Sequence, residues 1–372
     1  MGKNDWAIVV GIDTYFDANL PSLKGPDNDA QAFYDWVTSP SGGGVPPGKP
    51  VSDTKQAFLI QSSTFHRPFA SLQNALPTPR EIEETFKTLI DVADANAEKG
   101  AGLKIGDRLY LFFAGHGFEP HHPAESVALM TANATSEEVA HVLGTYLADW
   151  VYYMAFFNEV FLFMDCCRNP DKSVQPSMPY PDQRANDYQK VRRFYGFGAR
   201  GAKEAVERDF GGKVHGVFTY TLLEGLRGAA ADPDDPTIIT AESLRGYLYS
   251  AFPKNLDSQQ AANPNIPNEP EVRYEQKATK LRIVGKTGVI ARVQQAIGIA
   301  KAPDFPVRIT TQQHIGKTAN IRDKEWDVIN TIVLAASNDL RLERGYYQLE
   351  VPGAGEQLFE VSGAGGTVDV IV

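Results

Sequence analysis

The sequence of 372 residues predicts an α/β fold, in which a mainly parallel β-sheet is flanked by helices on both faces, followed by a small antiparallel β domain. Three observations predict it. Four short apolar runs alternate with helical patterns along the first 255 residues, which is the order expected of a parallel sheet with covering helices. These runs are apolar at nearly every position, as in strands buried on both faces. Beyond residue 280 the apolar residues alternate with polar ones, as in half-buried antiparallel strands.

Each expected strand is a short apolar run that ends at turn-forming residues. Residues 6–12 are rich in β-branched side chains and stop at an aspartate, and Gly106-Asp107 turns the chain into the run at 108–114. The expected strands are 6–12, 56–60, 108–114 and 160–164, with a shorter one at 127–130.

The expected helices follow apolar spacing of three and four residues and carry N-terminal signals. Asp27 and Asp29 lie in a first turn, where the helix dipole favours negative charge. Thr78 and Glu81 form a capping box around Pro79 at the start of a long helix. The expected helices cover residues 27–37, 78–92, 143–157, 217–226 and 241–250, with a loop rich in Gly and Pro at 38–50.

The last third of the chain has a different pattern. Residues 255–275 are rich in Asn, Gln and Pro, as in a linker, and residues 307–310, 346–351 and 357–361 alternate at period two between Pro-Gly and Gly-Gly turns. We therefore expect an α/β domain over 1–255, a linker over 256–280 and a β-rich domain of unknown role over 281–372.

Composition excludes several classes of protein. The chain is 42% hydrophobic and 22% charged, with a net charge of −10, which argues against a nucleic-acid binder and a basic membrane-surface protein. It has no apolar run of the ~18 residues that a membrane span needs. Its N-terminus lacks the regions of a signal peptide, so we expect a cytoplasmic protein. Its only cysteines, Cys166 and Cys167, are too few for a disulfide framework or a four-ligand zinc site.

Two of the expected strands run directly into reactive residues. The strand at 108–114 leads into His116, between two glycines, and the strand at 160–164 leads into Asp165-Cys166-Cys167. Because parallel strands end at one edge of a sheet, an imidazole and a thiol would come within reach of each other there. A nearby imidazolium would lower the pKa of a thiol, and the Gly117 N–H could donate to a developing oxyanion. A histidine at a strand end and a buried cysteine are each more often structural, so the joint pattern carries the prediction.

The sequence resembles the caspase-like cysteine peptidases, in particular the bacterial relatives of metacaspases (orthocaspases). Four stretches carry the resemblance, which covers roughly residues 5–255: LFFAGHG at 111–117, FMDCCRNP at 163–170, WAIVVGI at 6–12 with LKGPDNDA at 23–30, and HGVFTYTLLEGL at 215–226. The separation of His116 and Cys167, 51 positions, is also near the caspase spacing of about 50.

The resemblance implies an enzyme that hydrolyses peptide bonds through a thioester, with a catalytic dyad of His116 and Cys167 and no metal or other cofactor in the chemical step. Cys166 is then a neighbour of the nucleophile, and strand alternation directs it into the sheet.

The resemblance also implies that a substrate Arg or Lys is held by acids, which match Asp29 and Asp165, with Pro26 and Ala114 on the pocket wall. A desolvated carboxylate pair is stabilised by a guanidinium, so we expect protein or peptide substrates with basic residues. Asp165 as a strand-end cap and Asp29 as a dipole-stabilised helix acid are the structural alternatives. Arg168, beside the nucleophile, argues for the opposite preference unless it points away or pairs with an acid.

The sequence leaves open how the protein is regulated and whether it is an enzyme. In the family, the loop matching residues 183–213 shapes the cleft and can be cut during activation of a zymogen; the alternative here is a solvated basic loop. Some metacaspases need calcium, but acids such as Asp171 and Asp209 show no ordered ligand spacing. A regulatory partner could bind the C-terminal domain. Alternatively, the chain is a catalytically silent caspase-like interaction module; a nucleotide-binding α/β protein is disfavoured because no Gly-rich phosphate loop follows the first strand.

Overall fold

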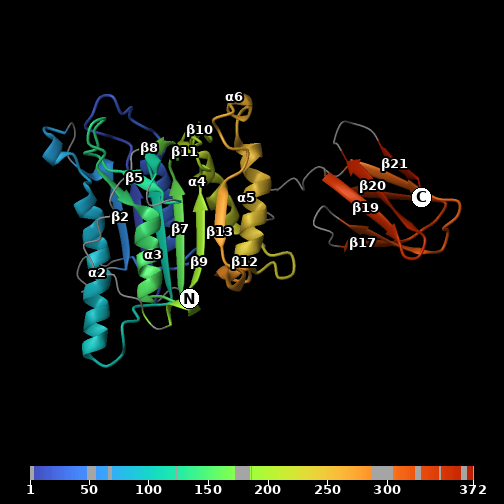
Figure 1. Cartoon of the computed structure of the whole chain (residues 1–372), viewed down its shortest axis with the longest axis horizontal. Helices are drawn as coiled ribbons and strands as arrows, with labels where there is room; N and C mark the ends of the chain where they lie inside the picture. The colour runs from blue at the N-terminus through green and yellow to red at the C-terminus, as the bar shows by residue number, and fades with distance from the viewer. Residues whose placement is uncertain are drawn as a thin grey trace. The chain divides into compact units, whose positions relative to one another are not determined.

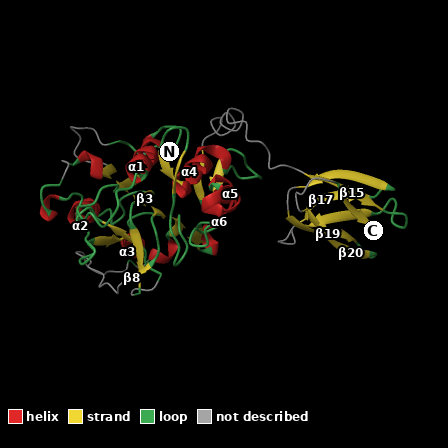
Figure 2. Cartoon of the chain, turned by 90° about the horizontal axis from the view of Figure 1, so that it is seen from above, coloured by secondary structure: helices red, strands yellow, loops and turns green. Residues whose placement is uncertain are grey.

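A computed structural model of the chain describes residues 4–47, 56–65, 69–121, 125–171, 185, 187–285, 305–322, 328–342, 345–361 and 367–371. The chain divides into two compact units, residues 1–296 and 297–372. The first unit combines helices and strands, whereas the described residues of the second are strands and loops (Figures 1 and 2).

The first unit is built on a six-stranded sheet with the order β13-β9-β7-β3-β1-β2. Five of its strands are parallel, and β13 runs antiparallel to β9 at one edge. The fold class predicted from the sequence is therefore confirmed. The strands are β1 (Trp6–Gly11), β2 (Ala57–Gln61), β3 (Arg108–Ala114), β7 (Glu159–Asp165), β9 (Arg192–Phe197) and β13 (Glu271–Tyr274).

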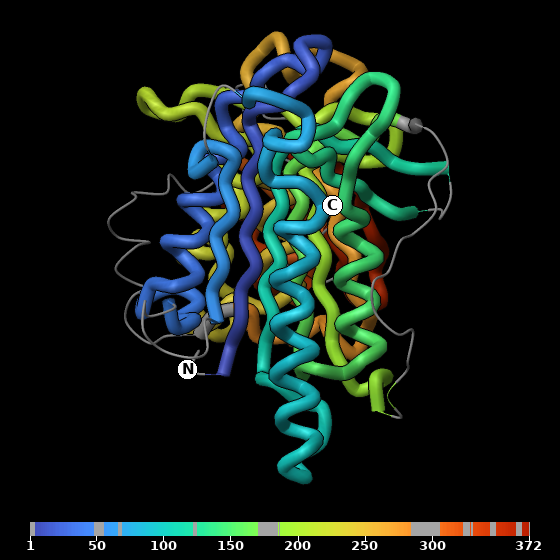
Figure 3. The backbone as a smooth tube through the Cα atoms, turned by 90° about the vertical axis from the view of Figure 1, so that its left-hand side faces the viewer, coloured from blue at the N-terminus to red at the C-terminus, as the bar shows by residue number. Residues whose placement is uncertain are grey.

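Helices cover both faces of this sheet. Alternate residues of the central strands point to opposite faces, so Val10 belongs to a core cluster with residues of α2 and α3, whereas Val9 belongs to a cluster with residues of α1, α4 and α5. Figure 3 shows the strands side by side with the cyan helix α2 lying along them. The helices are α1 (Pro26–Thr38), α2 (Pro79–Glu98), α3 (Gly144–Met154), α4 (Val217–Glu224), α5 (Ala241–Asn255) and α6 (Ser258–Ala262), with short helical turns at Ser62–Thr64, Leu72–Asn74, Tyr188–Lys190, Gly225–Ala229 and Gln276–Ala278.

Smaller sheets extend the first unit. One has the order β6-β5-β4-β8, β10 and β11 form an antiparallel pair, and β12 pairs with β14. The strands are β4 (Gly117–Pro120), β5 (Ala128–Met130), β6 (His141–Leu143), β8 (Pro170–Asp171), β10 (Glu207–Asp209), β11 (Val214–Gly216), β12 (Ile238–Thr240) and β14 (Arg282–Gly285).

The second unit has its own apolar core between two sheets, with the orders β18-β15-β21 and β17-β16-β19-β20. Among its described residues, the strand pairs are antiparallel except β15 with β21. Its strands are β15 (Phe305–Thr310), β16 (Thr318–Arg322), β17 (Val328–Val333), β18 (Ser337–Leu342), β19 (Gly345–Val351), β20 (Gly355–Val361) and β21 (Val368–Ile371).

The structure differs from the expected organisation in three places. The first is that β14, expected within the β-rich domain over 281–372, pairs with β12 of the first unit. The expected linker at 256–280 contains α6 and β13, and β13 completes the main sheet beside β9. The stretch at 183–213, expected as one loop, contains β9 and β10, while residues 183, 184 and 186 lie outside the described residues. Arg192 and Arg193 of β9 pair with Glu159 and Asp149, and Glu271 of β13 pairs with Arg168. Such charged residues make a strand of the sheet look like a solvated loop in the sequence. Among the described residues, no helix combines the length and apolarity needed to cross a bilayer.

Candidate active site

His116 and Cys167 lie at the same edge of the main sheet, just beyond the ends of two paired strands. Ala114 of β3 is in register with Asp165 of β7, and the Gly115 N–H donates to the Asp165 carbonyl at 3.2 Å. His116 lies two residues beyond the end of β3, and Cys167 lies two residues beyond the end of β7. The two residues line one cavity of about 170 Å³. The structure therefore brings together the two residues that the sequence singles out.

The His116 side chain is oriented by a backbone carbonyl. Its Nε2 lies 2.8 Å from the carbonyl oxygen of Pro21, an acceptor that requires a proton on Nε2. In the neutral ring this leaves Nδ1 unprotonated and able to accept a proton. The sequence gives no signal for Pro21, because a carbonyl contact across 95 residues leaves no side-chain pattern.

Cys167 is a protonated thiol in this arrangement. Its Sγ lies 3.8 Å from the carbonyl oxygen of Ala205, which accepts from the S–H. Burial raises the pKa of the Cys167 thiol above its ordinary value, opposite to the lowering expected from a nearby imidazolium. The segment that contains Ala205 covers the sulfur, and this desolvation disfavours the thiolate. Activation thus requires proton transfer at the moment of attack rather than a standing thiolate.

The neighbouring Cys166 packs into the protein, as strand alternation predicts. It is 2% exposed, and its Sγ lies 3.9 Å from the Ala128 carbonyl oxygen of β5. Burial raises the pKa of the Cys166 thiol well above its ordinary value. Cys166 is therefore a small buried side chain and lies outside the residues that line the cavity.

Gly117 directs its N–H toward the nucleophile segment. Gly117 of β4 lies opposite Leu129 of β5, and the Met130 N–H donates to the His116 carbonyl. Gly117 and Leu129 are therefore a non-hydrogen-bonded pair of this antiparallel ladder, in which the N–H of each residue points away from the other strand. On that same side of β4, the Glu119 N–H donates to the Asn169 carbonyl at 3.1 Å. A Cβ on Gly117 would lie 2.7 Å from the Cys166 sulfur, which accounts for glycine at this position.

Three acids line the same cavity as the dyad: Asp29, Asp165 and Glu207. Asp165 Oδ2 accepts from the Thr219 N–H at 3.0 Å and from the Thr219 hydroxyl at 2.7 Å. Burial, with a further contribution from Asp29, raises the pKa of Asp165 to about 7, and burial raises the pKa of Asp29 well above its ordinary value. Glu207 comes from β10 and accepts from the Gly25 N–H at 2.8 Å. The sequence analysis missed it, because an acid in a charged segment has no distinguishing local pattern.

A further residue that the sequence analysis missed is His215, on β11. Its Nδ1 lies 2.7 Å from Asp29 Oδ1, while the Gly216 N–H donates to Asp29 Oδ2 at 2.9 Å. Burial lowers the pKa of His215, so the neutral ring is favoured and donates from Nδ1. A Cβ on Gly216 would lie 2.1 Å from Asp165 Oδ2 and 3.1 Å from Asp29 Oδ2, so both carboxylates occupy the space that a side chain at this position would need.

Of the two other residues expected on the pocket wall, one lines the cavity and one does not. Pro26 lines the cavity, as expected, with Leu23 and Val206. Ala114 does not: it is 1% exposed and packs in the core with Phe112, because residues two apart on a strand face the same way.

Arg168 is turned away from the cavity and buried. Its guanidinium is paired with Glu119 at 2.9 Å and with Glu271, and it lies over the Phe197 ring. Arg168 therefore does not argue for an acidic substrate side chain, because two carboxylates outside the cavity neutralise its charge.

No group of three or more His, Cys, Asp or Glu side chains placed to hold a metal ion occurs in the part of the chain that the structure describes. Of the two acids considered for calcium, Asp209 accepts from the Gly212 N–H at 2.6 Å in a tight turn. The side chain of Asp171 lies outside the described residues.

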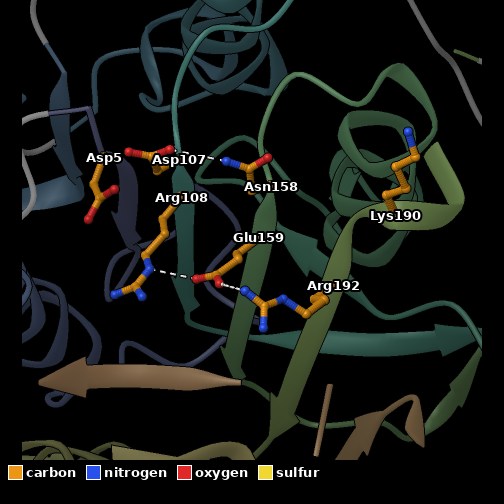
Figure 4. A pocket seen from close by; sticks show the side chains of 7 residues that line it. All are labelled: Asp5, Asp107, Arg108, Asn158, Glu159, Lys190 and Arg192. Atoms are coloured by element: carbon orange, nitrogen blue, oxygen red, sulfur yellow. Dashed lines mark hydrogen bonds and ion pairs between the residues drawn. The ribbon is translucent and has the colours of Figure 1, made fainter. Parts of the chain in front are cut away.

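A second cavity, of about 400 Å³, lies at the opposite end of the strands, where β3 and β7 begin (Figure 4). Its charges are largely paired with each other: Glu159 bonds Arg108 at 2.6 Å and also Arg192, and Asn158 donates to Asp107 at 3.1 Å. Burial raises the pKa of Asp5 there to about 6. The cavity combines equal numbers of acids and bases and has no nucleophile, so we assign it no chemistry.

A histidine and a cysteine at the carboxyl edge of a parallel sheet, beside an acid-lined cavity, define a candidate cysteine hydrolase. The chain belongs to the caspase domain family of peptidases, whose family model, described as "Caspase domain", matches residues 4–244. It is therefore a member of a cysteine peptidase family.

Individual relatives are distant. The chain is 22% identical to a protein named as a probable protease from a Desulfuromonadales bacterium, over 95% of this chain and 43% of that protein, so it spans less than half of that relative's length. Among solved structures, it is similar to caspase-1 from Spodoptera frugiperda, with 14% identity, a TM-score of 0.41 and coverage of 75% of this chain and 92% of that chain. A structure of pro-Sf-caspase-1 matches with 14% identity, a TM-score of 0.36 and coverage of 73% and 91%.

Proposed function

We propose that this protein is a cysteine endopeptidase that uses Cys167 as nucleophile and His116 as general acid–base, and that it cuts after Arg or Lys. The observation that carries the proposal is that a single cavity is lined by both residues and by three acids, Asp29, Asp165 and Glu207.

The reaction follows from the atoms at the sheet edge. His116 Nδ1, left unprotonated by the Pro21 contact, takes the proton from Cys167 as the sulfur attacks the scissile carbonyl carbon. The Gly117 N–H donates to the oxyanion of the tetrahedral intermediate. The imidazolium then protonates the leaving amine, and a thioester remains on Cys167. Water, deprotonated by the same imidazole, hydrolyses the thioester and regenerates the thiol.

Preference for a basic side chain follows from the electrostatics of the cavity. Asp29 is 2% and Asp165 is 7% exposed, so their negative charges are poorly solvated when the cavity is empty. A guanidinium or ammonium group between them compensates this charge, and a guanidinium does so with paired hydrogen bonds. An Asp side chain in the same place would bring a further carboxyl group beside these acids and would gain no compensating charge. With Arg168 paired outside the cavity, the lining residues include no Arg or Lys to hold an acid.

Matched fluorogenic peptides that differ only in the residue before the scissile bond test the proposal. We expect Arg- and Lys-ending peptides to be cut much faster than Asp-ending ones, and we expect no hydrolysis by Cys167→Ala. Faster cleavage of Asp-ending peptides would reject the basic preference. Absence of cleavage of every peptide in a folded protein would favour the alternative, a catalytically silent interaction module.

Binding of a basic group should depend on pH through Asp165. Burial and the nearby Asp29 raise the pKa of Asp165 to about 7, so its carboxyl is protonated below that pH and must lose its proton to pair with a cation. The inhibition constant of a small guanidinium inhibitor should therefore rise at least about tenfold as the pH falls from 8 to 6, since burial also raises the pKa of Asp29 and protonation of either acid weakens the pairing.

Asp165→Asn is the matched control for this pH dependence, since an amide does not titrate. The variant should bind the inhibitor more weakly at pH 8 and respond less to pH. An inhibition constant that is equal at pH 6 and pH 8 in the unmodified protein would contradict the assignment of Asp165 to this pocket.

A further inference from the structure

Tyr15, in the segment that follows β1, contacts His116 with both its hydroxyl and its ring. The Tyr15 hydroxyl accepts a hydrogen bond from the His116 backbone N–H at 2.7 Å and donates one to the Ile12 carbonyl at 3.0 Å. The ring centroids of Tyr15 and His116 lie 4.8 Å apart with the planes tilted by 46°. Tyr15 is 7% exposed, so this geometry is enclosed by the protein.

The backbone of the Gly-His-Gly turn is shaped around this hydroxyl. Gly115 has a φ of 153°, and a Cβ there would lie 2.8 Å from Tyr15 Oη and 3.0 Å from the Ile12 carbonyl oxygen. The Ile12 N–H donates in turn to the Ala114 carbonyl at 3.0 Å. The Tyr15 hydroxyl therefore ties the turn that carries His116 to the end of β1, which is itself fixed in the sheet.

We propose that Tyr15 is a positioning residue for the reaction, whose hydroxyl anchors the His116 backbone and whose ring restricts the imidazole, so that His116 stays in the cavity that it shares with Cys167. The inference rests on the proposed role of His116. His116 is thus held by three contacts: the Pro21 carbonyl at Nε2, the tilted Tyr15 ring beside the imidazole, and the Tyr15 hydroxyl at the backbone N–H.

The Tyr15 hydroxyl also determines which backbone N–H of the turn is available to a substrate. Because the His116 N–H is used by Tyr15, the Gly117 N–H is left as the donor directed toward the nucleophile segment. Burial raises the pKa of Tyr15 above its ordinary value, so the hydroxyl keeps its proton and continues to donate to Ile12 while it accepts from His116.

The test is Tyr15→Phe, with Tyr110→Phe as the matched control. Tyr110 is also fully buried, and its hydroxyl donates to the Ile283 carbonyl at 3.3 Å, but it lies near the opposite end of β3. A displacement of about 1 Å in a catalytic group costs about 10²-fold in rate. We therefore expect Tyr15→Phe to lower kcat by about 10- to 100-fold with KM changed less than about threefold, and Tyr110→Phe to leave kcat within about twofold of the unmodified protein.

Melting temperatures of both variants separate positioning from folding. Each variant loses one buried hydroxyl, so the two should lose similar stability, and only Tyr15→Phe should lose kcat. Equal kcat in both variants, or a loss of kcat that merely follows the loss of melting temperature in both, would overturn the inference. His116→Ala in the same assay separates a failure of the proposed function from a failure of the role of Tyr15. If His116→Ala leaves hydrolysis intact, the proposed function is wrong. If His116→Ala abolishes hydrolysis while Tyr15→Phe does not lower kcat, only the role of Tyr15 is wrong.

Discussion

Replacing His116 by alanine should lower kcat/KM for an arginine-ending peptide by about 10³-fold or more, and replacing Cys167 should remove the remaining activity. Burial holds Cys167 in its protonated form, so the sulfur cannot attack unless a base accepts its proton. Among the cavity-lining residues beside Cys167, the His116 imidazole has an unprotonated ring nitrogen suited to that step. Hydrolysis rates of the purified variants measure both effects.

Cys166→Ala is the control, because it removes the adjacent thiol without touching the cavity. Cys166 is 2% exposed and its sulfur packs against Gly117 and β5, so the substitution should cost about 1 kcal/mol of stability and leave most of the activity. Loss of activity in a folded Cys166→Ala protein together with an active Cys167→Ala protein would reverse the assignment of the nucleophile.

Replacing Arg168 by methionine should lower the free energy of unfolding by about 3 kcal/mol. The Arg168 side chain is 2% exposed and bridges Glu119 of β4 to Glu271 of β13, with the segment after Cys167 between them. Burial acts to raise the pKa of Glu271, but Arg168 and Arg273 hold it below its ordinary value. Methionine keeps much of the volume but leaves two carboxylates without their shared cation, and Arg273 compensates only one of them. Urea-induced unfolding measures the change.

Arg80→Met is the matched control for the lost charge. The ion pair of Arg80 and Glu84 lies on the surface of α2, with the two side chains 82% and 58% exposed, so its loss should change stability by less than about 0.5 kcal/mol. A similar small change for Arg168→Met would show that this buried network does not stabilise the nucleophile segment.

The sequence predicts the centre of the fold well, because its strongest local patterns lie there. The runs that become β1, β3 and β7 are apolar on both faces, which indicates a strand buried between two layers of helices. The start of α2 is equally local: Glu81 accepts from the Thr78 N–H at 2.7 Å, as the capping box predicts. Since parallel strands end at one edge, the meeting of His116 and Cys167 also follows from the pattern.

Other features depend on contacts that are distant in sequence. β9 begins with Arg192 and Arg193, which read as a solvated segment until Glu159 and Asp149 are placed beside them. The same is true of the cavity wall, since Glu207 reaches the N–H of Gly25 from 182 residues away. Such partners have no local signature, because each side chain alone is an ordinary charged or polar residue.

The most direct test of the account is the rate at which iodoacetamide alkylates each cysteine at pH 7, mapped by mass spectrometry. If His116 takes the Cys167 proton, Cys167 should react faster than the buried Cys166, and His116→Ala should slow its alkylation at least about tenfold. Equal alkylation of Cys167 with and without the imidazole would contradict the claim that these two side chains act as one unit.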